Sequence, residues 1–220
     1  MTTQQTHRTV KLEYPQIGEQ LRIRRRERGL SLRNLAERLG VSPSLISQIE
    51  RGQSNPSVST LYAIVSELDV SLDELLFNDR KPMMPGAVAQ IAPAFEVPRH
   101  PVQRAENRKS FRLASGVTWE RLTTTSEPGV EFLHVIYEVG GASSPVDAFQ
   151  RHSGHEWGYV LSGALTVTIG FDEYQLQAGD AVSLASSVPH RLANNGDEPV
   201  HAIWFVLGRV PLDDDLHGEG

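Results

Sequence analysis

Residues 31–52 read SLRNLAERLGVSPSLISQIERG, and this stretch decides the fold of the first part of the chain. Its apolar residues recur at helical spacing in two runs, which predicts two short helices joined by a turn at Gly40. Ser31 and Ser42 belong to the residue types that cap helix N-termini, and Pro43 suits a first helical position. Gly52 suits the position just past a helix end. The core-facing residues are then Leu32, Leu35, Ala36 and Leu39 in the first helix and Leu45, Ile46 and Ile49 in the second.

The second of these helices carries a polar face. Ser44, Ser47, Gln48 and Arg51 stand at positions i, i+3, i+4 and i+7, so they share one side of the helix. Such a helix fits the major groove of DNA, which is about 12 Å wide. The amide of Gln48 can form two hydrogen bonds with adenine, a contact that favours adenine over another base by about 1–3 kcal/mol. A helical bundle with a solvated polar face has the same spacing, so the residues alone leave both interpretations open.

Further helices are predicted on both sides of this pair. Ile17 and Leu21 indicate a preceding helix that Gly29 can end, and Ser71 with Glu74 forms a capping box for a short fifth helix. The fourth helix is indicated by Leu61, Ile64, Val65 and Leu68. A cluster of arginines in the first helix is expected to neutralise DNA phosphates. Its members are Arg22, Arg24, Arg25, Arg26 and Arg28.

The whole segment 17–76 resembles the Xre/lambda-repressor-like helix-turn-helix family, most specifically in LSLRNLAERLGVS, SLISQIERG and NPSVSTL. The resemblance implies a five-helix domain, taken as residues 17–77, that binds a two-fold operator in double-stranded DNA as a dimer. The base-reading positions of the family fall on Pro43, Ser44 and Gln48, and Pro43 is a departure where some relatives have a polar side chain. The residues expected to contact DNA are Arg33, Ser42, Pro43, Ser44, Ser47, Gln48 and Arg51.

The next segment, residues 78–109, is interpreted as a linker and lead-in, because prolines interrupt it repeatedly. The apolar period then changes from 3.6 to 2, which predicts short strands and an all-β sandwich or barrel over residues 110–208. Residues 1–16 and 209–220 are polar and are expected to be flexible. The predicted strands are Val117–Thr123, Val130–Val139, Glu156–Leu161, Ala164–Phe171, Ala181–Leu184 and Val200–Leu207.

One group of side chains in this second part has the composition of a metal site. His152, Glu156 and His190 form a two-histidine, one-carboxylate set, which suits Fe(II) and related divalent ions. Gln150, His152 and Glu156 share parity along an extended segment and are expected to point inward. His155, Trp157 and Tyr159 have the opposite parity and are expected outside the barrel. Most aromatic residues of this part were expected in the core or at a dimer contact rather than in a pocket: Trp119, Tyr137, Phe149, Trp157, Tyr159, Trp204 and Phe205.

Residues 110–208 resemble the cupin family, a double-stranded β-helix barrel. The first cupin motif ends in a glutamate, six residues and a glycine, which Glu156 and Gly163 match, and the second is matched by His190 and Asn194. Metal-binding cupins usually begin the first motif with His-x-His, and here Gln150 stands at the first of these histidines. The resemblance therefore implies a ligand pocket of Gln150, His152, Glu156 and His190. Either the last three hold a divalent metal (Fe, Zn, Ni or Mn), or the pocket is metal-free and binds its ligand directly.

Composition narrows the class of protein. The 220 residues include no cysteine, which excludes disulfides and thiolate chemistry, and no apolar run is long enough for a membrane span. The N-terminus has no signal-peptide pattern, so a cytoplasmic protein is expected. The net charge of −6 is unevenly spread: residues 1–52 hold ten Lys/Arg against five Asp/Glu, whereas residues 81–220 hold ten against seventeen. A basic N-terminal part joined to an acidic C-terminal part is typical of a small nucleic-acid-binding domain attached to a larger domain.

These patterns favour a dimeric transcriptional regulator whose operator binding responds to a small molecule in the barrel. One alternative is a mononuclear non-haem iron enzyme, because the arrangement is similar to that of hydroxypropylphosphonate epoxidases. Another makes the barrel only a dimerisation element, although inward polar residues such as Gln150 and Glu156 argue against a packed lumen.

Overall fold

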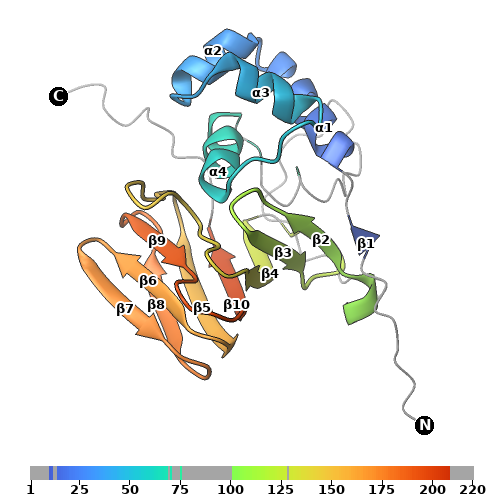
Figure 1. Cartoon of the computed structure of the whole chain (residues 1–220). Helices are drawn as coiled ribbons and strands as arrows, with labels where there is room; N and C mark the ends of the chain where they lie inside the picture. The colour runs from blue at the N-terminus through green and yellow to red at the C-terminus, as the bar shows by residue number, and fades with distance from the viewer. Residues whose placement is uncertain are drawn as a thin grey trace, which may run out of the picture.

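The computed structural model describes residues 10–11, 14–68, 70, 75, 101–127 and 129–208. Within these ranges a helical part stands on a β-barrel, and helix α4 (Val58–Glu67) lies between the other helices and the barrel (Figure 1). None of the helices in these ranges combines the length and the apolar character needed to cross a bilayer.

The helical part forms the expected helix-turn-helix. Its other helices are α1 (Tyr14–Glu27), α2 (Leu32–Arg38) and α3 (Pro43–Glu50). Ser31, Ser42 and Ser57 cap α2, α3 and α4, each accepting a hydrogen bond from a backbone N–H three residues on. The first helix begins at Tyr14, three residues before the predicted start. Four helices rather than five lie in the described part of the helical domain: the expected fifth, at 71–76, falls outside it except for Leu75, which is buried.

The core of this domain contains an ion pair as well as the predicted apolar residues. The guanidinium of Arg25 holds the carboxylate of Glu50 at 2.6 and 3.0 Å and donates to the carbonyl of Leu30 at 2.6 Å. The hydrogen bond from Glu50 raises the pKa of Arg25, against the opposing effect of burial. The expectation that Arg25 neutralises DNA phosphates is therefore wrong, because its guanidinium is buried and bound to Glu50. This ion pair joins α1 to α3.

The barrel consists of two facing sheets, whose order is β1-β2-β3-β4-β10-β5-β8 in one and β7-β6-β9 in the other. All strand pairs are antiparallel except β1 with β2, which is parallel. The strand β1 consists of Val10–Lys11, so two residues of the segment expected to be flexible pair with β2. The strands are β1 (Val10–Lys11), β2 (Lys109–Arg112), β3 (Val117–Arg121), β4 (Val130–Tyr137), β5 (His155–Ser162), β6 (Leu165–Ile169), β7 (Asp172–Leu176), β8 (Ala181–Ala185), β9 (His190–Ala193) and β10 (Val200–Leu207), and a short 3-10 helix spans Ala105–Asn107.

Six of these strands match predicted ones within two residues at each end, whereas β1, β2, β7 and β9 were not predicted as strands. The reason is visible in their composition: β7 reads DEYQL and buries no residue, and β2 and β9 have four residues each. Pairing with neighbours, rather than an alternating pattern of their own, stabilises such short strands.

A close packing contact inside the barrel fixes the position of one aromatic ring. A Cβ atom added to Gly158 on β5 would lie 2.0 Å from the ring of Trp204 on β10, and the two residues are directly paired. Only glycine at position 158 leaves room for this ring, so Trp204 lies across β5 toward the lumen.

Candidate functional site

The predicted DNA-reading face lies on the surface of the helical domain. Ser44 and Gln48 of α3 are exposed, as is Arg51 at its C-cap, and Ser47 is half-buried, while Ile46 and Ile49 on the opposite side are buried. Pro43 opens the helix, as predicted. The hydroxyl of Ser42 accepts a hydrogen bond from the backbone N–H of Leu45, so this residue caps the N-terminus of α3.

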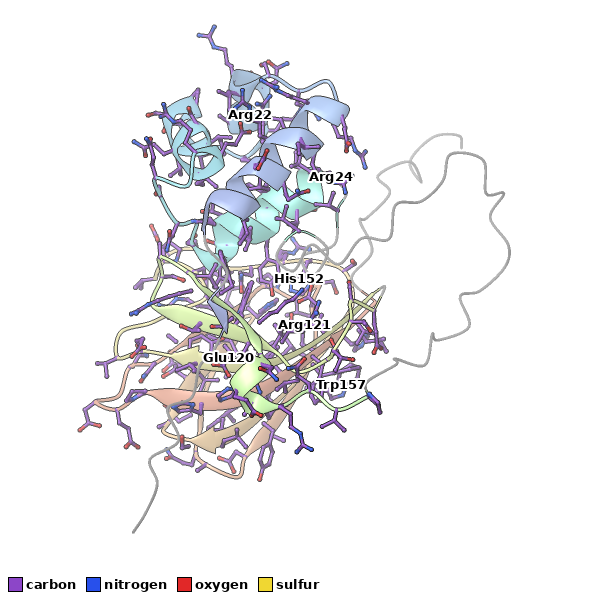
Figure 2. The ribbon with its side chains drawn as sticks, turned by 90° about the vertical axis from the view of Figure 1, so that its right-hand side faces the viewer. Arg22, Arg24, Glu120, Arg121, His152 and Trp157 are labelled. Atoms are coloured by element: carbon purple, nitrogen blue, oxygen red, sulfur yellow. The ribbon has the colours of Figure 1, made fainter. Side chains whose placement is uncertain are left out.

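The arginines around this face differ in their surroundings. Arg22, Arg26, Arg28 and Arg33 are exposed, whereas Arg24 pairs with Glu27 at 2.9 Å. Figure 2 shows Arg22 and Arg24 on the helical part, and His152 on the side of the barrel that faces this part. The surface charge of the helical domain therefore comes from fewer arginines than the sequence cluster suggests.

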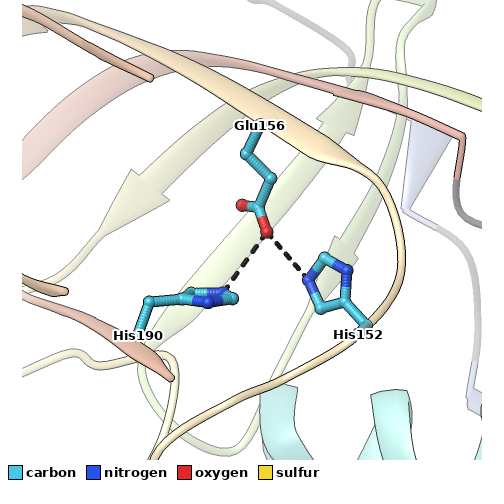
Figure 3. Close-up of side chains that lie close together, drawn as sticks. All are labelled: His152, Glu156 and His190. Carbon is cyan, nitrogen blue, oxygen red and sulfur yellow. Dashed lines mark ion pairs between the residues drawn. The ribbon is translucent and has the colours of Figure 1, made fainter. Parts of the chain in front are cut away.

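The three candidate metal ligands meet inside the barrel. Glu156 lies on β5, His152 in the segment leading into it, and His190 at the start of β9 in the other sheet. Glu156 Oε1 is 2.8 Å from His152 Nε2 and 3.3 Å from His190 Nε2 (Figure 3). The His190 and Glu156 side chains are almost fully buried and that of His152 is 10% exposed, so the group is shielded from bulk water.

Neighbouring groups orient all three ligands. The Nδ1 atoms of His152 and His190 each lie 2.9 Å from a backbone carbonyl, of Ser153 and Val188 respectively. Because a carbonyl only accepts, each Nδ1 carries the proton, and the Nε2 atoms face the site. The indole N–H of Trp204 donates to Glu156 Oε2 at 2.6 Å, which leaves Oε1 for the site. Outer hydrogen bonds of this kind fix the tautomer and direction of metal ligands.

Two imidazoles favour the ionised form of the buried Glu156 carboxyl. Burial opposes ionisation of this carboxyl, but the imidazoles of His152 and His190 outweigh burial and hold its pKa well below the usual range. Oε1 has no well-directed hydrogen bond from the described residues, although both Nε2 atoms are close. The ligand atoms of His152, Glu156 and His190 all lie within 4.8 Å of one another, and two imidazoles with one carboxylate form a set that could hold a divalent transition metal.

Gln150 lies beside this group, where metal-binding cupins usually carry a histidine. Its backbone pairs with that of His190, and its side chain lines the same cavity as His152 and Glu156. The Nε2 atom of Gln150 is buried and finds no acceptor among the residues described. An acceptor atom on a bound ligand would satisfy this donor.

The cavity wall also contains residues that the sequence did not indicate. Trp119, Tyr137 and Trp204 are buried in the core, as expected, and they also line the cavity, which the sequence did not indicate. Burial is the main cause that raises the pKa of Tyr137, and the nearby Tyr62 and Glu156 raise it further by electrostatic repulsion. The phenol of Tyr137 therefore stays protonated. Val58 and Tyr62 reach the cavity from α4, and helical periodicity carries no signal of what an outer helix face will cover.

The residues of opposite parity point away from this cavity. His155, Trp157 and Tyr159 are exposed on the outer face of β5, and Arg151 is exposed before it. Trp157 is labelled on the barrel in Figure 2. The alternation of β5 thus separates the chemistry of the lumen from an apolar outer surface.

Comparison with known proteins identifies both parts. The helix-turn-helix family model matches residues 21–75, and the cupin domain model matches residues 133–206. The chain is 28% identical over 177 residues to the HTH-type transcriptional regulator PuuR of Escherichia coli, covering 80% of this chain and 86% of that protein. It is also 28% identical over 187 residues to the HTH-type transcriptional regulator SutR of Escherichia coli, covering 84% and 90%.

A solved structure shares the arrangement of the two parts. The HTH_3 family transcriptional regulator from Vibrio cholerae superposes with a TM-score of 0.59 at 22% identity, covering 89% of this chain and 96% of that chain. This likeness concerns the fold. The similarity to PuuR and SutR spans both parts of the chain, and both are regulators rather than enzymes.

Proposed function

We propose that α3 reads a two-fold operator and that the barrel binds the small molecule controlling this reading. The support is that the two parts match a helix-turn-helix model and a cupin model, and that the chain is similar to the transcriptional regulators PuuR and SutR. One observation carries the DNA part of the proposal: α3 is capped by Ser42 and buried on one side, and its other side, with the C-cap residue, presents Ser44, Gln48 and Arg51 to solvent. The iron-enzyme alternative gives no role to this exposed helix face.

The experiment that tests operator reading is selection of genomic fragments on the purified protein at about 0.15 M salt, since affinity for DNA depends on salt. We expect recovery of a two-fold sequence. Gln48→Ala is expected to lower affinity for that sequence about 5- to 150-fold, which corresponds to the 1–3 kcal/mol of a bidentate adenine contact, while non-specific binding stays the same.

Gln177→Ala is the matched control for this variant, because Gln177 is an exposed glutamine on the barrel. It should select and bind the operator as the unaltered protein does. Equal operator affinity of Gln48→Ala and the unaltered chain would remove Gln48 from the reading face. Recovery of no common sequence by the folded protein would argue against the regulator as proposed.

For the barrel, we propose that His152, Glu156 and His190 hold a divalent transition metal such as Fe, Zn, Ni or Mn. The support is the convergence of Glu156 Oε1 with two Nε2 atoms whose rings are already oriented. A metal bound there would act as a Lewis acid that anchors an oxygen atom of the effector. Gln150 would donate to the same effector through its buried Nε2.

We further propose that the protein acts as a homodimer, since one recognition helix reads only one half of a two-fold operator. The outer face of the larger sheet supports a second copy as the partner. A row of adjoining aromatic rings lies on this face. The ring centroid of Trp157 is 6.0 Å from that of His155 and 5.7 Å from that of Phe205, and the centroids of Phe205 and Phe132 are 6.1 Å apart. A strand facing only water would carry polar residues at these positions, and adjoining exposed aromatic rings mark association surfaces.

Trp157→Glu is expected to convert this dimer to a monomer, because a carboxylate would be buried without a partner at the centre of the contact. Light scattering coupled to size-exclusion chromatography measures the outcome directly. Tyr174→Glu provides the matched control, since Tyr174 on β7 has an exposure (48%) close to that of Trp157 (42%). A Trp157→Glu protein that keeps twice the mass of one chain would place the contact elsewhere.

A further inference from the structure

The two sides of α4 belong to different parts of the molecule. Leu61, Ile64 and Val65 are buried in the core of the helical domain. Val58 and Tyr62, one helical turn apart, line the cavity of the barrel instead. Because α4 is part of the helical core on one side, a displacement of α4 from the barrel moves the rest of the helical domain with it.

Contacts at the start of α4 fasten it to the barrel. The N–H of Ser59 donates to the carbonyl of Ser143 at 3.1 Å, and the N–H of Ala114 donates to the carbonyl of Pro56 at 3.1 Å. The ring of Tyr62 has its centroid 5.4 Å from that of Trp119 and 5.3 Å from that of His152. The side chain of a candidate metal ligand is therefore in direct contact with the head.

The volume of the cavity shows what α4 leaves room for. With Tyr62 in place, the space bounded by Gln150, His152 and Glu156 measures about 20 Å³. A space of roughly 10–15 Å³ admits one water molecule, whereas sites for organic ligands occupy about 300–1,000 Å³. A single ion or water molecule fits beneath α4, but an organic effector does not.

We infer that α4 is the lid of the effector site and that Tyr62 is the group an organic effector must displace to reach His152, Glu156 and His190. This inference rests on the proposed function and names how that site is regulated. Binding of an effector in the cavity displaces α4 from the barrel. Because α4 is packed into the helical core, the recognition helix is displaced with it. By linkage, operator binding changes the affinity of the cavity for the effector by the same factor.

A thiol placed in the cavity tests this inference without knowledge of the effector, because the natural chain has no cysteine. In the full-length protein, Gln150→Cys should react slowly with the thiol reagent DTNB. Adding Tyr62→Ala removes the ring contacts with Trp119 and His152 and is expected to raise the rate about ten-fold or more. Tyr62→Phe keeps the ring and should leave the rate nearly unchanged.

Two controls keep the result interpretable. Ser187→Cys, exposed on the barrel surface, should react quickly and equally with and without Tyr62→Ala. Should Gln150→Cys fail to fold, Ser143→Cys offers a second thiol on the cavity wall. Equal labelling of the cavity thiol with Tyr62 present and absent would overturn the lid, because it would mean that the cavity opens by another route.

The coupling to DNA is measured by repeating the labelling with saturating amounts of the selected operator fragment. We expect the rate at the cavity thiol to change at least about five-fold, in whichever direction operator binding moves α4. An unchanged rate would overturn the coupling. If selection yields no operator, the DNA-reading proposal fails, while the labelling result without DNA still decides whether α4 is the lid.

Discussion

Replacing His190 with alanine is expected to abolish stoichiometric binding of a divalent transition metal by the barrel. Loss of an outer-shell partner costs about 10- to 100-fold in metal affinity, so loss of a direct ligand should cost more than about 100-fold. His190 is 1% exposed and its Nε2 is 3.3 Å from Glu156 Oε1, so solvent cannot readily supply a replacement ligand in the same place. Metal content after dialysis and titration calorimetry with Mn²⁺, Ni²⁺ or Zn²⁺ measure the effect.

Two further variants are expected to have no effect and an intermediate effect on metal affinity, respectively. His155→Ala is the matched control: this histidine is close to the site in sequence but lies on the outer face of β5, so metal affinity should not change. Trp204→Phe removes the hydrogen bond to Glu156 Oε2 and should lower affinity about 10- to 100-fold. If the unaltered protein binds none of these ions, Fe²⁺ under anaerobic conditions included, the metal is ruled out and the same cavity is a metal-free effector site.

Glu50→Ala is expected to destabilise the helical domain by about 3–5 kcal/mol, because it leaves the Arg25 charge buried without its partner. Arg25 and Glu50 are 6% and 9% exposed and share two hydrogen bonds, so water cannot replace the lost carboxylate. Since the bonds join α1 to α3, the loss acts on the support of the recognition helix. Urea unfolding followed by the helical circular dichroism signal gives the change in the free energy of unfolding.

The comparison for this variant is Glu67→Ala, which removes an ion pair at 2.5 Å with Arg38 near the surface. Exposed pairs are typically worth at most about 1 kcal/mol, so Glu67→Ala should change stability little. Similar unfolding midpoints for the two variants would show that the Arg25–Glu50 pair does not stabilise the helical domain more than a surface pair does.

The helices and their ends could be predicted because their causes are local. Ser31 and Ser42 cap the helices that they precede, and the apolar spacing of residues 32–49 matches the buried positions of α2 and α3. The start of α1 was predicted three residues late because its first turn has no apolar periodicity. The strands β4, β5 and β10 were predicted for a similar local reason, since each alternates between the core and the outside.

The candidate site was predictable where parity or motif applied and not elsewhere. Parity along an extended segment groups Gln150, His152 and Glu156, and the cupin motif adds His190 from the other sheet. Trp204 lies in the core as expected, but its hydrogen bond to Glu156 was not predictable, because the place of its ring depends on Gly158, a residue 46 positions earlier that leaves space for it. Contacts between distant residues of this kind depend on strand register, which no single stretch of sequence specifies.

The sequence alone thus determined the two domain types, the polar face of the recognition helix and the set of metal-ligand candidates, because periodicity, caps and motif spacing act over a few residues. The tertiary structure alone decided that Arg25 is buried against Glu50, that Trp204 donates a hydrogen bond to Glu156, and that Tyr62 of the helical part lines the cavity of the barrel. These last features depend on how complete elements pack. Shape and burial, rather than local propensity, select such contacts.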